Sequence, residues 1–445
     1  MKREGMKAEG WGRFPRIDGQ LVSGWDEMAV LRRIAAGGSM IACGARRSYG
    51  DASLNPAGML SMVPMDRLLD FDPATGLLLC EAGVTLADIL DVFVPRGWFP
   101  AVTPGTRFVT VGGAVAADVH GKNHHRDGGF GAHLAFCDVM LADGRVIRCS
   151  PDRDPDLFAA TLGGMGLTGV ILRASLRLRP IETAWIREDI FRSSGLDETL
   201  DLFGRLHDRS YSVAWIDAFA TGARIGRAVV MTGDHAGLDE LPAELRQAPL
   251  ARTVRRLPAV PPGCPSWLLN RASVRAFNEA YHRLARPRRR LSALDSFFHP
   301  LDAVPAWNRL YGRRGFLQYQ CVLPRTAAAA GLRRLLAETA GSGWPSFLAM
   351  LKPLGEQGMG LMSFPMEGYT LALDFPAAEP VFPLLRRLDA IVDDHGGRLY
   401  LAKDARMDAG MLRRGYPAVD RFQEIRAAYG SCGRFGSLQS RRLDL

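Results

Sequence analysis

The order of hydrophobic and polar positions predicts short helices and strands in alternation over the first 100 residues. Residues 26–37 place apolar side chains at helical spacing and end in Gly37-Gly38, which predicts an amphipathic helix. Residues 77–84 form a short apolar run typical of a strand. Residues 85–97 follow as a helix, with Thr85 as its N-cap and a glycine stop. This mixture indicates an α+β chain.

The next segment carries a hairpin and a long strand. Residues 136–149 predict a hairpin with Asp143-Gly144 as its two-residue turn. Residues 154–164 predict a short helix stopped by glycines. Residues 170–180 alternate apolar and basic side chains, which predicts a half-buried strand. Residues 109–121 mix apolar side chains and glycine without a long helical period.

Composition excludes several classes of protein. The 445 residues are 47% hydrophobic and 23% charged, which excludes a disordered chain, a coiled coil and a collagen-like fibre. No apolar run reaches the roughly 18 residues that a membrane span needs, and the basic N-terminal stretch lacks the apolar centre of a secretory signal. The seven cysteines are widely spaced without a CxxC pair, so we expect neither a metal site nor a disulfide framework, and a reducing cytoplasm is the simplest compartment.

The positive charge is concentrated in one segment, residues 246–290. The whole chain has a formal net charge of +9, and this segment holds 11 arginines against a single acid, Glu279. A neutral body with one basic segment favours docking to an anionic surface such as a membrane, and no nucleic-acid module is present. Aromatic and aliphatic side chains lie between the arginines: Trp267, Leu268, Leu269, Phe277 and Tyr281. A solvated arginine-rich loop without a partner is the equally weighted alternative.

Two glycine-bearing loops, residues 42–55 and 104–125, are candidates for holding a pyrophosphate. Glycine permits a positive φ and a close approach of a ligand to the backbone, whose amides then form an anion-binding nest. The nest positions are Gly44, Gly50, Gly105, Gly112 and Gly113. Two tight turns without a ligand are the alternative, which becomes less favoured because basic residues stand nearby: Arg46, Arg47, His120, Lys122, His124 and His125.

Residues 164–169 match the G-x-G-x-x-G pattern of dinucleotide-binding proteins, but their context is reversed. That fingerprint needs a strand before the glycines and a helix after them. Here a predicted helix precedes the glycines and a predicted strand follows. We therefore reject NAD binding at these residues.

Several motifs together resemble the vanillyl-alcohol-oxidase-type FAD-binding oxidoreductases. In the first half these are RRSYGD at 46–51, the loop from Pro104 to His125 with HGKNHH, and the element from Asp156 to Ile171. In the second half SVAWIDA at 212–218, FHPLD at 298–302, GFLQYQ at 315–320 and YLAKDAR at 400–406 narrow the resemblance to members that oxidise a lipid-linked ribose. The resemblance covers nearly the whole chain and is weakest at about 235–290.

The resemblance implies a two-domain α+β fold of that family. Its FAD-binding domain comprises residues 1–183 and 398–445, and a substrate domain built on an antiparallel sheet, residues 184–397, is inserted between them. The implied reaction is oxidation of the 2′-hydroxyl of a polyprenyl-phosphoryl β-D-ribose to the 2′-keto sugar, with quinone or oxygen as electron acceptor. A separate keto-sugar reductase completes epimerisation to the arabinose donor for cell-envelope polysaccharide. We expect a cytoplasmic enzyme, peripheral on the inner membrane face, that contacts the membrane through residues 246–290.

Two other functions remain open. One is an FAD-dependent aldonolactone or alditol oxidase, which shares the FAD domain but acts on a soluble sugar. The other is a flavin-binding adaptor without catalysis, against which the retention of Lys403 and His120 argues.

The resemblance also assigns candidate site residues. For non-covalent FAD, since residues 42–55 contain no histidine, the cofactor-binding set is Ala42, Cys43, Gly44, Ala45, Arg46, Arg47, Ser48, Tyr49, Gly50, Asp51, Ala52, Gly105, Thr110, Val111, Gly112, Gly113, Ala117, Asp118, Val119, His120, Ile171 and Tyr400. The catalytic candidates are Lys403, His120 and Tyr49, and the substrate candidates are Lys122, Trp215, Gln318, Gln320, Lys352 and Lys403.

The proton acceptor and two departures from the family stay open. Lys403 is one candidate base if burial lowers its pKa, and Asp404 would oppose this if the two side chains pair. A charged Lys403 would instead orient the hydroxyl, the role that we slightly favour, and His120 is the other candidate base. Ala372 stands at the family's cysteine position, and Phe298 replaces a tyrosine before the HPLD motif. The first departure removes a reactive thiol and the second a hydroxyl.

Overall fold

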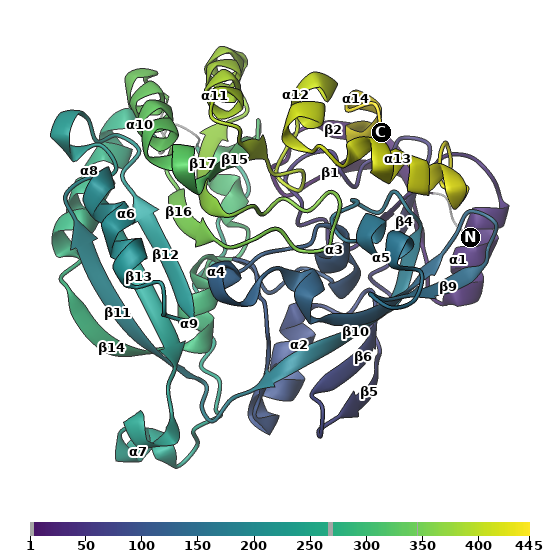
Figure 1. Cartoon of the computed structure of the whole chain (residues 1–445), viewed down its shortest axis with the longest axis horizontal. Helices are drawn as coiled ribbons and strands as arrows, with labels where there is room; N and C mark the ends of the chain where they lie inside the picture. The colour runs from purple at the N-terminus through teal and green to yellow at the C-terminus, as the bar shows by residue number, and fades with distance from the viewer. Residues whose placement is uncertain (1–3, 266–269, 345) are drawn as a thin grey trace.

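The computed structural model describes residues 4–265, 270–344 and 346–445, whose strands form three sheets (Figure 1). The smallest sheet has the order β1-β2-β4-β3, with strands Glu4–Glu9, Arg16–Ser23, Met59–Ser61 and Ile41–Cys43. The second sheet has the order β5-β6-β10-β8-β9, and β7 also pairs with β10. In that order, the strands are Leu68–Asp72, Leu77–Glu81, Val170–Pro180, Leu134–Met140 and Val146–Cys149, and β7 is Trp98–Pro100. Trp267, Leu268 and Leu269 lie outside the described residues.

The third sheet is the largest, and every strand pair that it contains is antiparallel. Its order is β14-β11-β13-β12-β16-β17-β15-β18, with strands Arg288–Ala293, Trp185–Ser193, Ala228–His235, Tyr211–Ile216, Ala349–Leu354, Gly368–Pro376, Phe316–Pro324 and Arg398–Leu399. This mixed architecture with a large antiparallel sheet confirms the predicted fold class. The domain limits at 183/184 and 397/398 stay a prediction.

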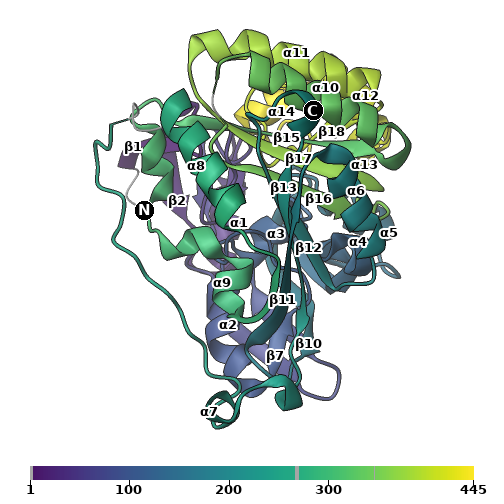
Figure 2. The same ribbon diagram turned by 90° about the vertical axis from the view of Figure 1, so that its left-hand side faces the viewer.

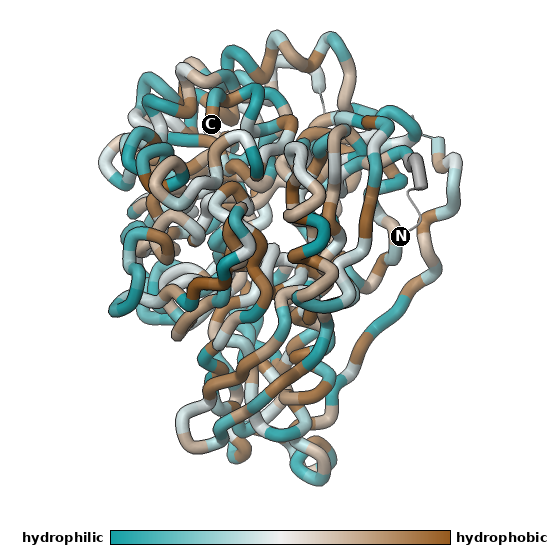
Figure 3. Tube along the Cα trace, turned by 90° about the vertical axis from the view of Figure 1, so that its right-hand side faces the viewer, coloured by the Kyte–Doolittle hydropathy of each residue, from teal (hydrophilic) through white to brown (hydrophobic). Residues whose placement is uncertain are grey.

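The α-helices lie around the sheets, except for α3, which lies inside the molecule with Val111, Ala114 and Val115 fully buried. They are α1 Glu27–Ala35, α2 Leu86–Phe93, α3 Val111–Ala116, α4 His124–Asp127, α5 Pro155–Thr161, α6 Leu196–Arg205, α7 Ala243–Arg246, α8 Arg271–Leu284, α9 Leu294–Phe298, α10 Arg325–Gly341, α11 Phe382–Asp394, α12 Ala409–Gly415, α13 Val419–Ala428 and α14 Leu438–Arg442. Helices α6, α10 and α11 pack on one face of the third sheet (Figures 1 and 2). In Figure 3, brown hydrophobic stretches run through the middle of the molecule, and teal hydrophilic stretches are frequent at its periphery. Within the described residues, no helix combines the length and the apolar character needed to span a bilayer.

Local signals in the sequence correctly predict several elements of the first 180 residues. Asp26 caps α1, and Thr85 forms a reciprocal capping box with Asp88 at the start of α2. The hairpin at Asp143-Gly144 is β8 and β9, and Gly144 has φ +87°. The rejected G-x-G-x-x-G segment indeed follows helix α5 and precedes strand β10.

Two local expectations differ from the structure. Residues 111–116 form a helix, α3, because the Thr110 hydroxyl accepts the Gly113 N–H at its start. Strand β10 is buried on both faces over most of its first seven positions rather than half-buried. The reason is its central place between β6 and β8, where Arg173 reaches Glu27 and Asp138 as ion-pair partners.

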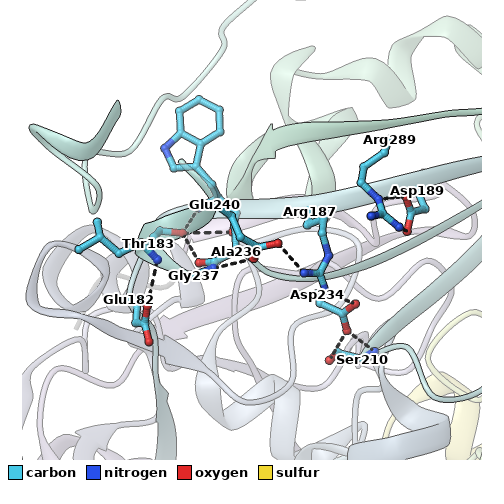
Figure 4. A network of polar contacts seen from close by, with 12 residues as sticks. Glu182, Thr183, Arg187, Asp189, Ser210, Asp234, Ala236, Gly237, Glu240 and Arg289 are labelled. Atoms are coloured by element: carbon cyan, nitrogen blue, oxygen red, sulfur yellow. Dashed lines mark hydrogen bonds and ion pairs between the residues drawn. The ribbon is translucent and has the colours of Figure 1, made fainter. Parts of the chain in front are cut away.

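Polar contacts fix the chain where it crosses from β10 into the third sheet (Figure 4). Arg187 pairs with Asp234 at 3.3 Å and also with Glu240, and the Asp234 carboxylate accepts the Ser210 N–H and hydroxyl. At the edge of the same sheet Arg289 pairs with Asp189 at 2.7 Å. The basic segment therefore ends in a strand, β14, in which Arg289 and Arg290 pair with acidic residues of β11.

A buried ionic cluster joins the first glycine loop to the C-terminal part of the chain. One Arg442 nitrogen lies 2.8 Å from Asp51 and 2.9 Å from Asp404, whose carboxylate side chains are 6% and 2% exposed. Beside the cluster, the Tyr49 N–H donates to the Ala402 carbonyl at 3.0 Å. Removing the shared cation would leave two carboxylates close together in a low-dielectric environment.

We therefore predict that Arg442→Met lowers the free energy of unfolding by about 3–5 kcal/mol, the usual cost of breaking a buried ion pair from one side. Urea denaturation of the cofactor-free protein measures this difference. Arg421→Met is the matched control, because Arg421 pairs with Asp156 and Glu424 at the surface, where each partner is more than half exposed, and we expect a loss of no more than about 1 kcal/mol. Equal effects of the two substitutions would contradict the prediction.

Candidate active site

A cavity of about 580 Å³ lies between the two glycine loops and the third sheet. The loops contribute residues around 42–53 and 103–122, and the sheet contributes the face opposite α10 and α11. The turn after β18, which ends in Ala402 and Lys403, also lines the cavity. Segments from both ends of the chain and from its middle therefore meet at this one cavity.

The first loop has the geometry of an anion nest. Arg46 has φ +50°, a left-handed conformation within the run of amides that the nest requires. No backbone carbonyl of the described residues accepts the N–H groups of residues 45–48. A Cβ on Gly44 would lie 2.0 Å from the Thr110 hydroxyl, so the two loops touch at a point that only glycine permits. These amides fit a pyrophosphate that approaches from the cavity.

The second loop presents its glycines differently. Nothing lies within 4 Å of a Cβ built on Gly105, so this position faces open space in the cavity, whereas a Cβ on Gly112 would lie 2.8 Å from Ala82. Gly113 also lines the cavity. Gly105 thus leaves room for a ligand, while Gly112 is required for packing against the second sheet.

Most of the predicted cofactor residues line the cavity, and four do not. Asp51 turns away to Arg442, and a Cβ on Gly50 would lie 1.9 Å from the Asp404 carbonyl. Val111 is fully buried in the hydrophobic core, and Asp118 accepts the Gly131 N–H and the Ser363 hydroxyl. These four residues support the loops from behind. The lining members are Ala42, Cys43, Gly44, Ala45, Arg46, Arg47, Ser48, Tyr49, Ala52, Gly105, Thr110, Gly112, Gly113, Ala117, Val119, His120, Ile171 and Tyr400.

His120 is buried in the cavity wall, where its two ring nitrogens differ. Its Nε2 lies 3.3 Å from Nε2 of Gln320, and its Nδ1 has no hydrogen-bond partner among the residues that the structure describes. Because an amide nitrogen donates, the imidazole Nε2 accepts and the ring proton resides on Nδ1. Burial, reinforced by nearby Lys352, holds the pKa of His120 well below its ordinary value. A neutral ring is therefore left with one N–H available to a ligand.

Three of the five lysines in the sequence line the cavity: Lys122, Lys352 and Lys403. Burial lowers the pKa of Lys122 and of Lys403 to about 7 and the pKa of Lys352 to about 8. The Lys122 ammonium lies 4.2 Å from the centre of the Phe297 ring and donates to the Phe297 carbonyl. Amines that share a desolvated cavity repel one another as cations, and an anionic ligand would relieve that repulsion.

The carboxylate that acts on Lys403 is Asp374, not Asp404. Asp404 accepts the backbone N–H groups of Arg406 and Met407 and pairs with Arg442, so it does not pair with the lysine beside it. Asp374 is fully buried on β17 and raises the pKa of Lys403, while burial and Lys352 lower it. The Lys403 amine also lies 3.6 Å from the centre of the Tyr49 ring, a contact that favours the charged form.

Two further hydrogen bonds hold Asp374. Gln318 donates to its Oδ1 at 2.7 Å, and the Tyr311 hydroxyl donates to its Oδ2 at 3.3 Å. Burial raises the pKa of Asp374 to about 7. Burial and the Asp374 charge keep the pKa of Tyr49 well above its ordinary value, so the phenol stays protonated and is no base near neutral pH.

The predicted substrate residues on the third sheet all face the cavity. Gln318 and Gln320 lie two apart on β15 and both line it, as the period of a strand predicts. Their amide nitrogens already bind Asp374, His120 and Thr370. Trp215 on β12 lines the same cavity, as do Ala372 and Phe298, the two departures from the family pattern.

Several residues of the site carry no local signal in the sequence. Asp374 cannot be predicted from the residues around it, because the pairing of β15 with β17 places it opposite Gln318. Glu188 likewise reaches the cavity through the pairing of β11 with β14. Met165, Gly166 and Gly169 belong to the rejected NAD fingerprint, yet they line the cavity beside the first loop. Their glycine spacing was a usable signal for a ligand-facing turn, although not for a dinucleotide on a helix N-terminus.

Comparison with known proteins gives similarities that range from nearly the whole chain to about a third of it. A family model described as an FAD binding domain matches residues 25–150. The chain is 37% identical to decaprenylphosphoryl-beta-D-ribose oxidase of Mycolicibacterium smegmatis over 98% of this chain and 97% of the relative. It is 39% identical to an uncharacterized protein of Streptomyces coelicolor over 81% of this chain and all of the relative. D-arabinono-1,4-lactone oxidase of Yarrowia lipolytica is 25% identical over 35% of this chain and 30% of the relative.

The lysine cluster yields a titration prediction. Reductive methylation with ¹³C-formaldehyde labels the lysine and N-terminal amines, and three lysine resonances should titrate between about pH 7 and 8, following the lowered pKa values of Lys122, Lys352 and Lys403. Lysine-to-arginine variants assign the peaks. Asp374→Asn removes the carboxylate that favours the charged amine, so the Lys403 resonance should titrate at lower pH while that of Lys122 stays. A Lys403 resonance that titrates near pH 10 would contradict the lowered pKa of this lysine.

Proposed function

The chain belongs to the vanillyl-alcohol-oxidase-type FAD-binding oxidoreductases, within the group that contains decaprenylphosphoryl-β-D-ribose oxidase, and is an FAD-dependent enzyme acting on CH–OH groups; we propose that it oxidises the 2′-hydroxyl of a polyprenyl-phosphoryl β-D-ribose to the 2′-keto sugar. The similarity to the mycobacterial oxidase extends over nearly the whole chain, whereas the lactone oxidase matches only about a third of it. The proposed reaction is the first half of an epimerisation that a separate reductase completes.

The observation that carries this proposal is the cluster of lysines in the cavity. A chain with 56 basic residues and only five lysines places three of them around one cavity. Asp374 acts on Lys403 and Glu188 acts on Lys122, so part of this positive charge is already offset, and a phosphate-bearing sugar supplies further negative charge. A neutral lactone or alditol would add no negative charge to the cavity, so the soluble-sugar alternative explains the lysine cluster less well.

Lys403, His120 and Asp374 each have a different role in the proposed reaction. Bound FAD supplies the acceptor for a hydride from the carbon that carries the hydroxyl. Lys403, with its pKa lowered to about 7, has a neutral amine fraction that accepts the hydroxyl proton near neutral pH. The Nδ1–H group of His120 donates a hydrogen bond to an oxygen of the bound substrate. Gln320 donates to Nε2 and thereby holds the imidazole in the tautomer that carries its proton on Nδ1. Gln318 and Tyr311 keep Asp374 in place to tune Lys403.

We propose that the FAD is non-covalent and binds with its pyrophosphate at the first loop. Residues 42–55 offer no histidine for attachment. Cys43 is the one cysteine in that loop, and burial raises the pKa of its thiol to about 11, which keeps the thiol protonated and unreactive. The backbone N–H groups of residues 45–48, which donate to no backbone carbonyl of the described residues, support the pyrophosphate position.

The reaction is tested by anaerobic absorbance spectroscopy of the purified yellow protein. Polyprenyl-phosphoryl ribose should bleach the flavin band, whereas an aldonolactone or alditol should not. Lys403→Gln should retain FAD and lower the rate of bleaching by about 10²–10³-fold, the usual contribution of a positioned proton acceptor. The wild-type rate should rise with pH through about 7, because the neutral amine is the reactive form.

The control substitution is Lys7→Gln, at an exposed lysine of β1, and it should leave the rate of bleaching unchanged. Acid precipitation should release all of the yellow colour into solution if FAD is non-covalent. Bleaching by a lactone but not by the lipid-linked ribose would replace the proposed substrate with a soluble sugar.

We also propose that residues 246–290 bring the enzyme to an anionic membrane, where its substrate resides. Part of the positive charge is used inside the molecule, because Arg252 pairs with Asp295 and Arg290 pairs with Glu188. Other arginines of the segment are exposed, among them Arg255, Arg256, Arg271 and Arg275. An exposed arginine near an anionic bilayer contributes about 1 kcal/mol to binding.

Vesicle sedimentation measures this contribution. Changing Arg255, Arg256, Arg271 and Arg275 together to glutamine should weaken binding to phosphatidylglycerol-containing vesicles by about a hundredfold or more. The matched control changes four exposed arginines elsewhere, Arg333, Arg334, Arg387 and Arg421, to glutamine. If both quadruple variants bind like the wild type, the membrane role of the segment is wrong.

A further inference from the structure

One row of side chains crosses four strands of the third sheet and links the polar end of the cavity to helix α8. Gln320 lies opposite Ala372, Ala372 lies opposite Met350, and Met350 lies opposite Trp215. Residues directly opposite one another in antiparallel strands point to the same face, and all four line the cavity. Three strand spacings separate the ends of the row, about 14 Å. Beyond Gln320 the row contains no charged side chain.

Aromatic side chains continue this row to the surface. The rings of Trp215 and Tyr281 of α8 lie edge to face with their centroids 4.8 Å apart, and the Tyr281 ring stacks on that of Phe277 with a centroid distance of 5.7 Å. The centroids of Phe277 and Phe347 are 5.3 Å apart. Phe277 lines the cavity and is also 42% exposed to solvent. An apolar path therefore runs from beside His120 to the outside of the molecule.

Helix α8 is fixed in this position rather than loosely laid over the cavity. Asn278 donates to Asp217 at 2.7 Å, and Arg227 bridges Asp217 and Glu279 at 2.7 Å each. His282 makes a 2.9 Å hydrogen bond to the Ser193 carbonyl. The opening beside Phe277 is consequently a built part of the fold.

The surroundings of this opening are apolar on one side and basic on the other. Leu284, seven residues after Phe277 and so on the same side of α8, is 79% exposed. Arg271, Arg275 and Arg283 lie on the other flank of the helix and are exposed. The extended segment before α8 runs along the outside of the molecule and is tied to the loop at 303–305 by backbone hydrogen bonds from Leu257 and Val260 (Figure 2).

We propose that the path Ala372–Met350–Trp215–Tyr281–Phe277 holds the first isoprene units of the polyprenyl chain and delivers that chain to the membrane beside Leu284. This inference rests on the proposed function, since it assigns the apolar part of the same substrate. An isoprenoid chain is the occupant that matches both observations: a row of apolar and aromatic side chains, beside which the charges of Glu188 and Arg290 pair with each other, and a basic helix flank suited to anionic lipid headgroups.

Equilibrium binding of polyprenyl phosphates to the FAD-loaded protein tests the path without requiring turnover. Decaprenyl phosphate and geranyl phosphate are titrated calorimetrically in the same detergent micelles, because the shorter chain reaches fewer of these side chains. Phe277→Ala should weaken decaprenyl phosphate binding about tenfold and geranyl phosphate binding less than twofold, as expected for loss of apolar area near the exit. Phe277→Leu should restore most of the affinity, and Met28→Ala, at a 54% exposed apolar position on α1, should have no effect.

The outcomes separate this inference from the proposed reaction. Equal weakening of both ligands, no weakening at all, or loss of FAD from Phe277→Ala would each overturn the path. If the ribose substrate fails to bleach the flavin while decaprenyl phosphate binding still depends on Phe277, the proposed reaction is wrong and the path stands. If the flavin bleaches and Phe277 has no effect, the reaction stands and the path is wrong.

Discussion

The shared ion pair of Arg442 with Asp51 and Asp404 is the constraint on which the rest of the site depends. It joins the loop after β3 to the turn after β18, two segments from opposite ends of the chain. Beside it, the Tyr49 N–H binds the Ala402 carbonyl, and this contact sets the Tyr49 ring against the Lys403 amine. Because the ions are largely withdrawn from water, the geometry is costly to break from either side, and the two loops have little freedom to separate. The position of Lys403 relative to the first glycine loop therefore follows from contacts that do not themselves line the cavity.

The parts of the fold that the sequence predicts well are those that local chemistry determines. Capping residues, turn glycines and strand periodicity correctly indicate α1, α2, the β8–β9 hairpin and the shared face of Gln318 and Gln320. The electrostatics of Lys403 was not predictable in this way. Sequence adjacency suggested Asp404 as its partner, but Arg442 and two backbone amides hold that carboxylate elsewhere. Asp374 takes its place through a pairing register that no local pattern contains.

The use of lysine rather than arginine in the cavity has a physical reason. A guanidinium remains charged under nearly all conditions, so three arginines in this desolvated space would repel one another permanently. A buried amine can lose its proton instead, and the lowered pKa values of Lys122, Lys352 and Lys403 reflect that response. An anionic ligand beside Lys122 and Lys352 then restores their charge by raising those two pKa values. In a chain otherwise dominated by arginine, lysine is thus placed where the charge has to be adjustable.

The period of the strands explains how the same segments build both a core and a binding surface. On β15, Gln318 and Gln320 face the cavity, whereas Tyr319 and Cys321 are buried on the opposite face of the sheet. On that opposite face, Arg406 lies over the Tyr319 ring and pairs with Asp389 of α11. On β17, Ala372 faces the cavity and Leu371 and Leu373 are fully buried. A slip of one residue would exchange these two sets, so packing of the apolar set against α10 and α11 fixes which polar groups reach the cavity. The hydrophobic core therefore specifies the register, and the register in turn aligns Gln320, Ala372, Met350 and Trp215 into one continuous row.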